Sequence, residues 1–158
     1  MNNERLKIYV NDHLALLVGE TELAERCHKA NGEASLGQFL QQLSADLHSE
    51  QQLLRDMLER IGGTPSLVKQ SMAWLAEKVG RLKLNDALLE YSELSRLVEL
   101  ETLFGAAHER QSLWENLEAT HAADTRLLSI NFTQQLQQAQ RHCDALAKHR
   151  LEAAKKAL

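Results

Sequence analysis

The sequence has few residues that break helices or favour strands. It contains one proline and seven glycines in 158 residues, and β-branched residues nowhere alternate with polar ones as they do in a half-buried strand. Leu, Ala, Glu, Gln, Lys and Arg, which favour helices, are abundant. These features argue against a sheet-based fold and predict an all-α protein with a single domain, residues 1–158.

The sequence also lacks long apolar runs and an excess of basic residues. The longest purely apolar run, LALLV at 14–18, is too short to span a bilayer, and the net charge is −4. The first residues, MNNERLK, have no apolar core of signal-peptide length. Cys27 and Cys143 fall at helical core positions, as buried free thiols do. We therefore expect a cytoplasmic protein without stable membrane insertion and without a nucleic-acid partner.

Sequence motifs of the common catalytic sites are missing as well. There is no glycine-rich phosphate loop, no paired CxxC and no nucleophile elbow. No catalytic residue or organic cofactor site can therefore be named, and whether the protein is an enzyme stays open.

Apolar residues recur at helical spacing in two long segments of the first half. The first helix is expected over residues 3–30, and Asn31-Gly32 ends it because glycine readily takes a positive φ. Its inward stripe is Leu6, Val10, His13, Leu17, Glu20, Ala24 and Cys27. The second helix is expected over residues 35–61, opened by a capping box of Ser35 and Gln38. Its stripe is Leu36, Leu40, Leu43, Leu47, Glu50, Leu54, Met57 and Ile61.

Two further long helices are expected after residue 92. The third begins near Ser92 and has the stripe Leu94, Leu97, Val98, Glu101, Phe104 and His108. The fourth has the stripe Leu128, Phe132, Leu136, Ala139, Cys143 and Leu146. Neither glycine nor proline separates them. We place their turn at 117–122, where the stripe loses its phase and Thr120 with Asp124 offers a new helix start.

The lengths of the connections predict the topology. Short turns make the first two helices antiparallel, and likewise the last two. A long crossover, residues 62–92, separates the two pairs and contains a short fifth helix after Thr64-Pro65. In its helix lengths, crossover position and inward polar residues, the chain resembles the ferritin-like four-helix-bundle superfamily over nearly its whole length. A plain up-down bundle is the alternative.

Six ionisable side chains lie on or beside the inward stripes. Five interrupt the stripes themselves, and Asp46 precedes Glu50 by one turn; the five are His13, Glu20, Glu50, Glu101 and His108. With 1.5 Å per residue and the ferritin-like topology, all six fall within a band of roughly 15 Å near mid-bundle. Because an unpaired buried carboxylate costs several kcal/mol, this layer needs a cation or hydrogen-bond donors.

The resemblance implies that the cation is a pair of iron or manganese ions, oxidised by dioxygen or peroxide. By position the implied ligands are Glu20, Glu50, Glu101 and His108, with His13 and Asp46 as lesser candidates. The superfamily's Glu-x-x-His pairs are not intact, because Leu53 follows Glu50 and Ser49 follows Asp46 at that spacing. The last helix offers only neutral amides at mid-bundle height, namely Asn131, Gln135 and Gln138.

A buried polar network is the alternative to a metal site. In that arrangement His13 hydrogen-bonds to Glu50 or to a backbone carbonyl, and the glutamates pair with histidines or an arginine. If the layer is only such a network, exchanging both Glu20 and Glu50 for leucine is expected to be neutral or stabilising.

Three functions are compatible with these features. The first is a ferritin-like bundle with a degenerate metal site, acting as a stress-related or scaffold protein through association, as a homodimer. The second is a dinuclear iron or manganese oxidase with atypical ligands. The third is a helical adaptor that binds a partner with its crossover helix.

Overall fold

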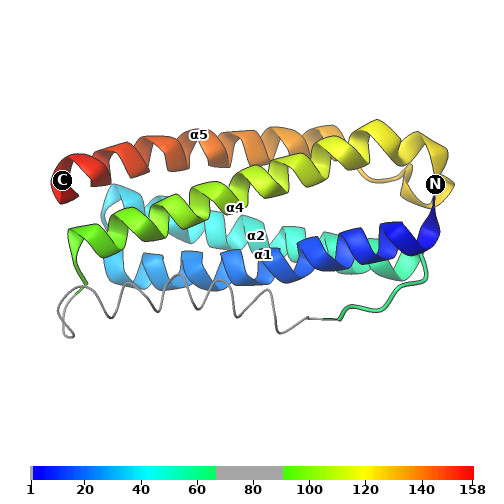
Figure 1. Ribbon diagram of the computed structural model, residues 1–158, viewed down its shortest axis with the longest axis horizontal. Helices are drawn as coiled ribbons and strands as arrows, with labels where there is room; N and C mark the ends of the chain where they lie inside the picture. The colour runs from blue at the N-terminus through cyan, green and yellow to red at the C-terminus, as the bar shows by residue number, and fades with distance from the viewer. Residues whose placement is uncertain (1, 67–90) are drawn as a thin grey trace.

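The computed structural model describes residues 2–66 and 91–158, and every regular element in these ranges is a helix (Figure 1). The long helices are α1 (Asn3–Asn31), α2 (Ser35–Arg60), α4 (Glu93–Thr120) and α5 (Phe132–Ala157), and two short 3-10 helices, η1 (His121–Ala123) and η2 (Thr125–Leu127), lie between the last two. The predicted all-α helical bundle is confirmed for this part of the chain. The expected fifth helix and most of the crossover, residues 67–90, lie outside the described residues.

The turn between α1 and α2 combines a correct and an incorrect prediction. Gly32 follows α1 with a φ of 58°, as expected. The capping box is not formed: Ala34 occupies the cap position of α2 without a side-chain hydrogen bond, and the side-chain amide of Gln38 donates to the carbonyl of Glu33 at 3.1 Å. Gly37 packs so closely on the turn that a Cβ there would overlap the Gly32 carbonyl oxygen. This close approach brings the start of α2 directly against the end of α1.

The connection between α4 and α5 is longer than predicted. Helix α4 ends at Thr120, inside the expected window, but α5 begins only at Phe132. Asp124 accepts a hydrogen bond from the Arg126 amide and caps η2, and Asn131 accepts one from the Gln134 amide and caps α5. These local hydrogen bonds compete with helix formation, so Leu128, expected in the core, lies exposed outside α5.

Contacts between the helices fix their directions. Three hydrogen-bonded pairs join α1 to α4: Tyr9 with Asn116, Glu20 with Arg110, and Arg26 with Glu99. The residue numbers rise along α1 as they fall along α4, so these two helices are antiparallel. Phe39 and Asp46 of α2 meet His149 and His142 of α5 in the same antiparallel sense. Helices α1 and α5 therefore run in one direction and α2 and α4 in the other (Figure 1).

The ends of the crossover lie far apart along α1. The Ser66 amide donates to Asn11 at 2.7 Å, whereas Asn31 donates to the Tyr91 hydroxyl at 3.1 Å. Twenty helical residues separate Asn11 from Asn31, or roughly 30 Å of helix axis. Residues 67–90 connect these two points, so the chain changes ends of the bundle between α2 and α4.

The core between the four helices consists mainly of leucine. Most inward positions of α1 and α2 are buried as predicted, and Trp114 of α4 is the largest fully buried side chain among the described residues. Within residues 2–66 and 91–158, no helix is both long and apolar enough to cross a membrane.

Candidate functional site

Two glutamates predicted to face inward do meet at mid-bundle. Glu20 lies on α1 and Glu50 on α2, and their exposed fractions are only 2% and 3%. The helical stripes explain this, because each glutamate occupies a position where the pattern calls for an apolar residue. Two buried carboxylates side by side require a positive charge close to them.

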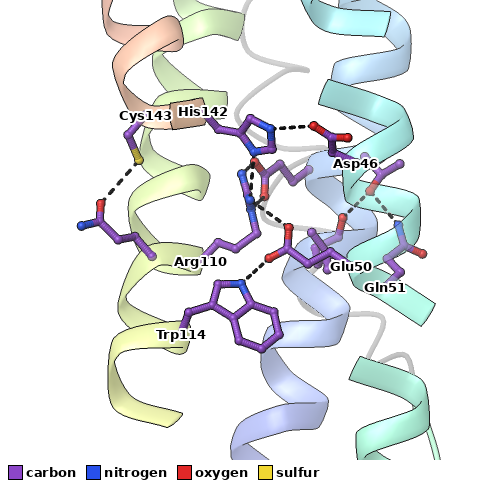
Figure 2. A network of polar contacts seen from close by, with 11 residues as sticks. Asp46, Glu50, Gln51, Arg110, Trp114, His142 and Cys143 are labelled. Carbon is purple, nitrogen blue, oxygen red and sulfur yellow. Dashed lines mark hydrogen bonds and ion pairs between the residues drawn. The ribbon is translucent and has the colours of Figure 1, made fainter. Parts of the chain in front are cut away.

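Arg110 of α4 supplies that charge (Figure 2). Its Nε and Nη2 atoms donate to Glu20 Oε2 and Oε1, both at 3.1 Å, and its Nη1 donates to Glu50 Oε2 at 2.9 Å. Arg110 is itself only 4% exposed. Burial opposes the charged guanidinium, but the two carboxylates outweigh it and raise the pKa of Arg110. One guanidinium therefore links α1, α2 and α4 in a single buried ion cluster.

Trp114, one turn beyond Arg110, completes the environment of Glu50. The indole N–H donates to Glu50 Oε1, so each carboxylate oxygen of Glu50 has its own donor. Burial nevertheless raises the pKa of Glu50 above its ordinary value, and the nearby Glu20 adds to this, against the opposing effect of Arg110 and Trp114. The arginine thus compensates the two carboxylates only in part.

The fourth helix contributes a histidine to the cluster. His142 Nδ1 lies 3.2 Å from Arg110 Nη1, and its Nε2 lies 3.0 Å from Asp46 Oδ2 on α2 (Figure 2). A guanidinium has only donors, so Nδ1 must accept and Nε2 must carry the proton. Burial first, and then the charge of Arg110, lowers the pKa of His142 to about 4. The imidazole is therefore neutral near pH 7, with a fixed tautomer.

A second set of buried hydrogen bonds lies on α1 and α2 beside the ion cluster. Gln51 donates to the Thr21 hydroxyl at 2.6 Å, and Thr21 in turn donates to the carbonyl of Leu17 at 2.7 Å. These contacts join α1 and α2 next to the ion cluster, and the guanidinium of Arg55 donates to Gln51 Oε1 at 3.3 Å. We refer to Glu20, Glu50, Arg110, Trp114, His142 and Asp46 together as the Arg110 cluster.

Three predicted members of the mid-bundle layer are not in this cluster. Glu101 and His108 are exposed on α4, where His108 packs edge-on against Phe104 with ring centroids 4.5 Å apart. His13 is half-buried beside Tyr9, with ring centroids 4.6 Å apart, and it forms no hydrogen bond with Glu50. Burial lowers the pKa of His13. The placement of Glu101 and His108 was wrong because α4 buries a different face, consisting of Leu97, Leu100, Leu103, Ala107, Arg110, Leu113, Trp114 and Leu117.

Arg110 and His142 were missed in the sequence, although their positions carried a signal. Ala107, Trp114 and Leu117 share helical spacing with Arg110, so the arginine interrupts an apolar stripe in the same way as the glutamates do. His142 immediately precedes Cys143 on the predicted stripe of the last helix and shares its buried face. The expected amides Asn131 and Gln135 have no part in the Arg110 cluster; Gln138 reaches only its edge, beside Asp46.

The residues present do not fit the dinuclear metal site that the resemblance implies. Arg110 lies between the two glutamates, and its N–H groups take three of their four carboxylate oxygens. Trp114 takes the fourth. Across residues 2–66 and 91–158, no three His, Cys, Asp or Glu side chains are grouped so that they could hold a metal ion.

A second buried acid lies between α1 and α4, nearer the end of the bundle. Glu99, 6% exposed, accepts hydrogen bonds from Arg26 at 2.6 Å, from the Tyr91 hydroxyl at 2.9 Å and from the Cys27 thiol at 3.1 Å. Burial and the nearby carboxylate raise the pKa of Cys27, so its thiol stays protonated. The two ion pairs between α1 and α4 have opposite polarity, since α1 provides Glu20 in one and Arg26 in the other. This reversal favours a single register of α1 against α4.

Comparison with known proteins adds no assignment. No protein-family model, no curated protein and no solved structure matches this chain.

Proposed function

We propose that this protein is a ferritin-like bundle with a degenerate metal site, acting as a stress-related or scaffold protein through association rather than as a metal oxidase. The observation that carries this proposal is the position of Arg110 between Glu20 and Glu50. A guanidinium there joins three helices at mid-bundle and carries out no redox chemistry. The parallel directions of α2 and α4, with the long crossover between them, support the ferritin-like topology.

An oxidase would need features that the Arg110 cluster does not offer. A metal pair requires space between its carboxylates and an open coordination position for an oxidant, and here the guanidinium of Arg110 occupies the space between Glu20 and Glu50. Here each oxygen of Glu20 and Glu50 accepts a hydrogen bond from a buried donor. Entry of metal would require Arg110 to leave, which would place an unpaired guanidinium in the leucine core or at its surface.

Association through the outer faces is consistent with several exposed apolar side chains. Ile8 on α1, Leu128 before α5 and Leu151 on α5 are 63%, 56% and 52% exposed. Such side chains are common singly on protein surfaces, so the oligomeric state must be measured. We expect a homodimer, which sedimentation equilibrium would detect as twice the chain mass; a chain that remains monomeric at tens of micromolar would remove the support for self-association.

The metal content of the purified protein tests the proposal directly. Cells are grown with added iron and manganese, and the metal per chain is measured in the wild type, in Glu50→Ala and in the exposed control Glu101→Ala. We expect far less than one equivalent in all three proteins. About two equivalents in the wild type and in Glu101→Ala, lost in Glu50→Ala, would overturn the proposal in favour of a dinuclear oxidase.

A further inference from the structure

The four long helices form two hairpins. The N-terminal hairpin consists of α1 and α2, and the C-terminal hairpin consists of α4 and α5 (Figure 1). In the first, Gly37 packs on the Gly32 carbonyl, and His28 Nδ1 lies 2.8 Å from the carbonyl oxygen of Gly37. In the second, the guanidinium of Arg150 on α5 lies over the ring of Phe104 on α4, 5.1 Å from its centroid. Such contacts, together with the connection between its two helices, set the register within each hairpin.

Buried polar contacts cross from one hairpin to the other (Figure 2). Arg110 of the C-terminal hairpin donates to Glu20 and Glu50 of the N-terminal hairpin. His142 of the C-terminal hairpin donates to Asp46 on α2. Further side-chain hydrogen bonds cross the same boundary at 2.6, 2.9 and 2.7 Å, between Arg26 and Glu99, Tyr9 and Asn116, and Arg60 and Ser129. The boundary between the hairpins therefore has the features of an interface between two chains, with an apolar centre and specific hydrogen bonds.

The charges on the two facing surfaces are complementary. At mid-bundle, Glu20 and Glu50 lie on the N-terminal hairpin and Arg110 lies on the C-terminal one. Nearer the end of the bundle the polarity is reversed, because Arg26 lies on the N-terminal hairpin and Glu99 on the C-terminal one. A shifted or inverted pairing would bury a carboxylate without a cation, so these ion pairs select both the partner hairpin and its register.

The connection between the hairpins does not restrict this choice to one chain. Ser66 at its start hydrogen-bonds to Asn11, and Tyr91 at its end hydrogen-bonds to Asn31, roughly 30 Å further along α1. A chain of the length of residues 67–90 can span at most roughly 80 Å. The connection is therefore long enough for the C-terminal hairpin to meet the N-terminal hairpin of a second copy. Such an exchange reproduces every contact between the hairpins and needs no additional surface.

We propose that the chain forms its homodimer by exchanging hairpins, so that the C-terminal hairpin of each copy packs on the N-terminal hairpin of the other. This inference rests on the homodimer of the proposed function and names the surface that forms it. On the outer faces, exposed apolar side chains such as Ile8 and Leu151 are of a kind common on monomers. The boundary between the hairpins instead combines a buried ion cluster with a leucine core. In the dimer, Arg110 binds Glu20 and Glu50 of the second copy.

Two complementary variants of the full-length chain test the exchange. Arg110→Met leaves the two glutamates without their cation, and Glu20→Leu with Glu50→Leu leaves Arg110 without its counter-charges. Each variant alone should have an unfolding equilibrium constant about 100- to 1,000-fold above that of the wild type. In an exchanged heterodimer of the two, one bundle regains all three native residues, and the other combines two leucines with a methionine. Both bundles are then free of unpaired buried charge.

The two variants, one of them with an affinity tag, are unfolded together in urea and refolded at tens of micromolar. We expect the tagged chain to retain an equal amount of the other chain, and the urea midpoint of the mixture to return close to that of the wild type. The control is the tagged triple variant Glu20→Leu, Glu50→Leu and Arg110→Met, refolded with the wild type. An exchanged heterodimer of that pair would contain two mismatched bundles, so each chain should pair only with itself.

Other outcomes overturn the exchange. A dimeric wild type whose complementary variants do not rescue each other associates through its outer faces, which leaves the homodimer of the proposed function standing. Equal capture in both mixtures has the same meaning, because pairing is then indifferent to the Arg110 cluster. Variants that stay unfolded when mixed also overturn the exchange. A wild type that is monomeric at tens of micromolar does so too, and removes the support for self-association as well. About two equivalents of metal in the wild type would refute the proposed function without bearing on the exchange.

Discussion

Removing both glutamates of the Arg110 cluster should destabilise the protein strongly. From the sequence alone, Glu20→Leu with Glu50→Leu was expected to be neutral or stabilising, because leucine suits a core position. The structure predicts the opposite sign for this change in stability. Arg110 is 4% exposed and directs three of its N–H groups at these two carboxylates, so the double variant leaves a buried cation without a counter-charge. The expected loss is about 3–5 kcal/mol of unfolding free energy.

Replacing the cation as well should restore most of that stability. In the triple variant with Arg110→Met, three apolar side chains of similar length fill the volume and no charge is buried. Exchanging a buried ion cluster for apolar residues is often neutral or stabilising by about 1–4 kcal/mol. Against this, the Trp114 N–H loses its acceptor, at a cost of about 1–3 kcal/mol. The triple variant should therefore lie within about 2 kcal/mol of the wild type.

Urea unfolding followed by circular dichroism at 222 nm measures both differences. The wild type, Arg110→Met, the double and the triple variants form a set in which the double should be the least stable or nearly so. Equal slopes with urea concentration would show that the variants expose the same surface on unfolding. A double variant as stable as the wild type, or a triple variant no more stable than the double, would refute the role given to Arg110.

Stability should fall with pH below about 6.5, because the pKa of His142 is about 4 in the folded chain and 6.5 is its ordinary value. The unfolded chain then binds the proton first, so up to about 3 kcal/mol is lost as pH falls from 6.5 to 4. The raised pKa of Glu50 has the opposite effect on stability. The urea midpoints of the wild type and of His142→Gln are therefore compared across this pH range, so that the contribution of His142 is their difference. Identical pH profiles for the two proteins would contradict the buried neutral imidazole. Gly37→Ala should cost about 2 kcal/mol or more, because its Cβ meets the Gly32 carbonyl, whereas Gly105→Ala, with open space around its Cβ on α4, should stabilise by about 0.5–1 kcal/mol. Thermal unfolding of Gly37→Ala and Gly105→Ala checks the geometry of the turn between α1 and α2. Equal shifts of the midpoint temperature in the two variants would contradict that geometry.

The sequence predicts the helices of the first half well because local signals agree there. Residues 3–30 contain no proline and a single glycine, Gly19, and the spacing of leucines shows an inward face that includes Glu20. Helix α2 is similar, with Glu50 in the middle of a leucine stripe. In these helices the apolar stripes indicate the burial of Glu20 and Glu50. They do not indicate the burial of Thr21 and Gln51, which lie beside the stripes and are 2% and 5% exposed.

The sequence indicates less clearly which face of α4 is buried. This helix has apolar residues around much of its circumference, so both the stripe through Leu94 and Phe104 and the stripe through Leu100 and Trp114 have helical spacing. Only packing against α1 and α5 decides between them. The error placed Glu101 and His108 inside and overlooked Arg110, and it turned an ion cluster into an apparent set of metal ligands.

The amino-acid sequence by itself determined the all-α class, the bounds of α1 and α2 to within one residue, and the inward positions of Glu20 and Glu50. These follow from hydrogen bonds and side-chain spacing within one helix, which depend on neighbours in the chain. The tertiary structure alone decided that Arg110 lies between the two carboxylates and that His142 accepts from it while donating to Asp46. Those contacts join residues 32 to 96 positions apart, and their geometry depends on the rotation of each helix about its own axis, which only the packing of all four helices fixes.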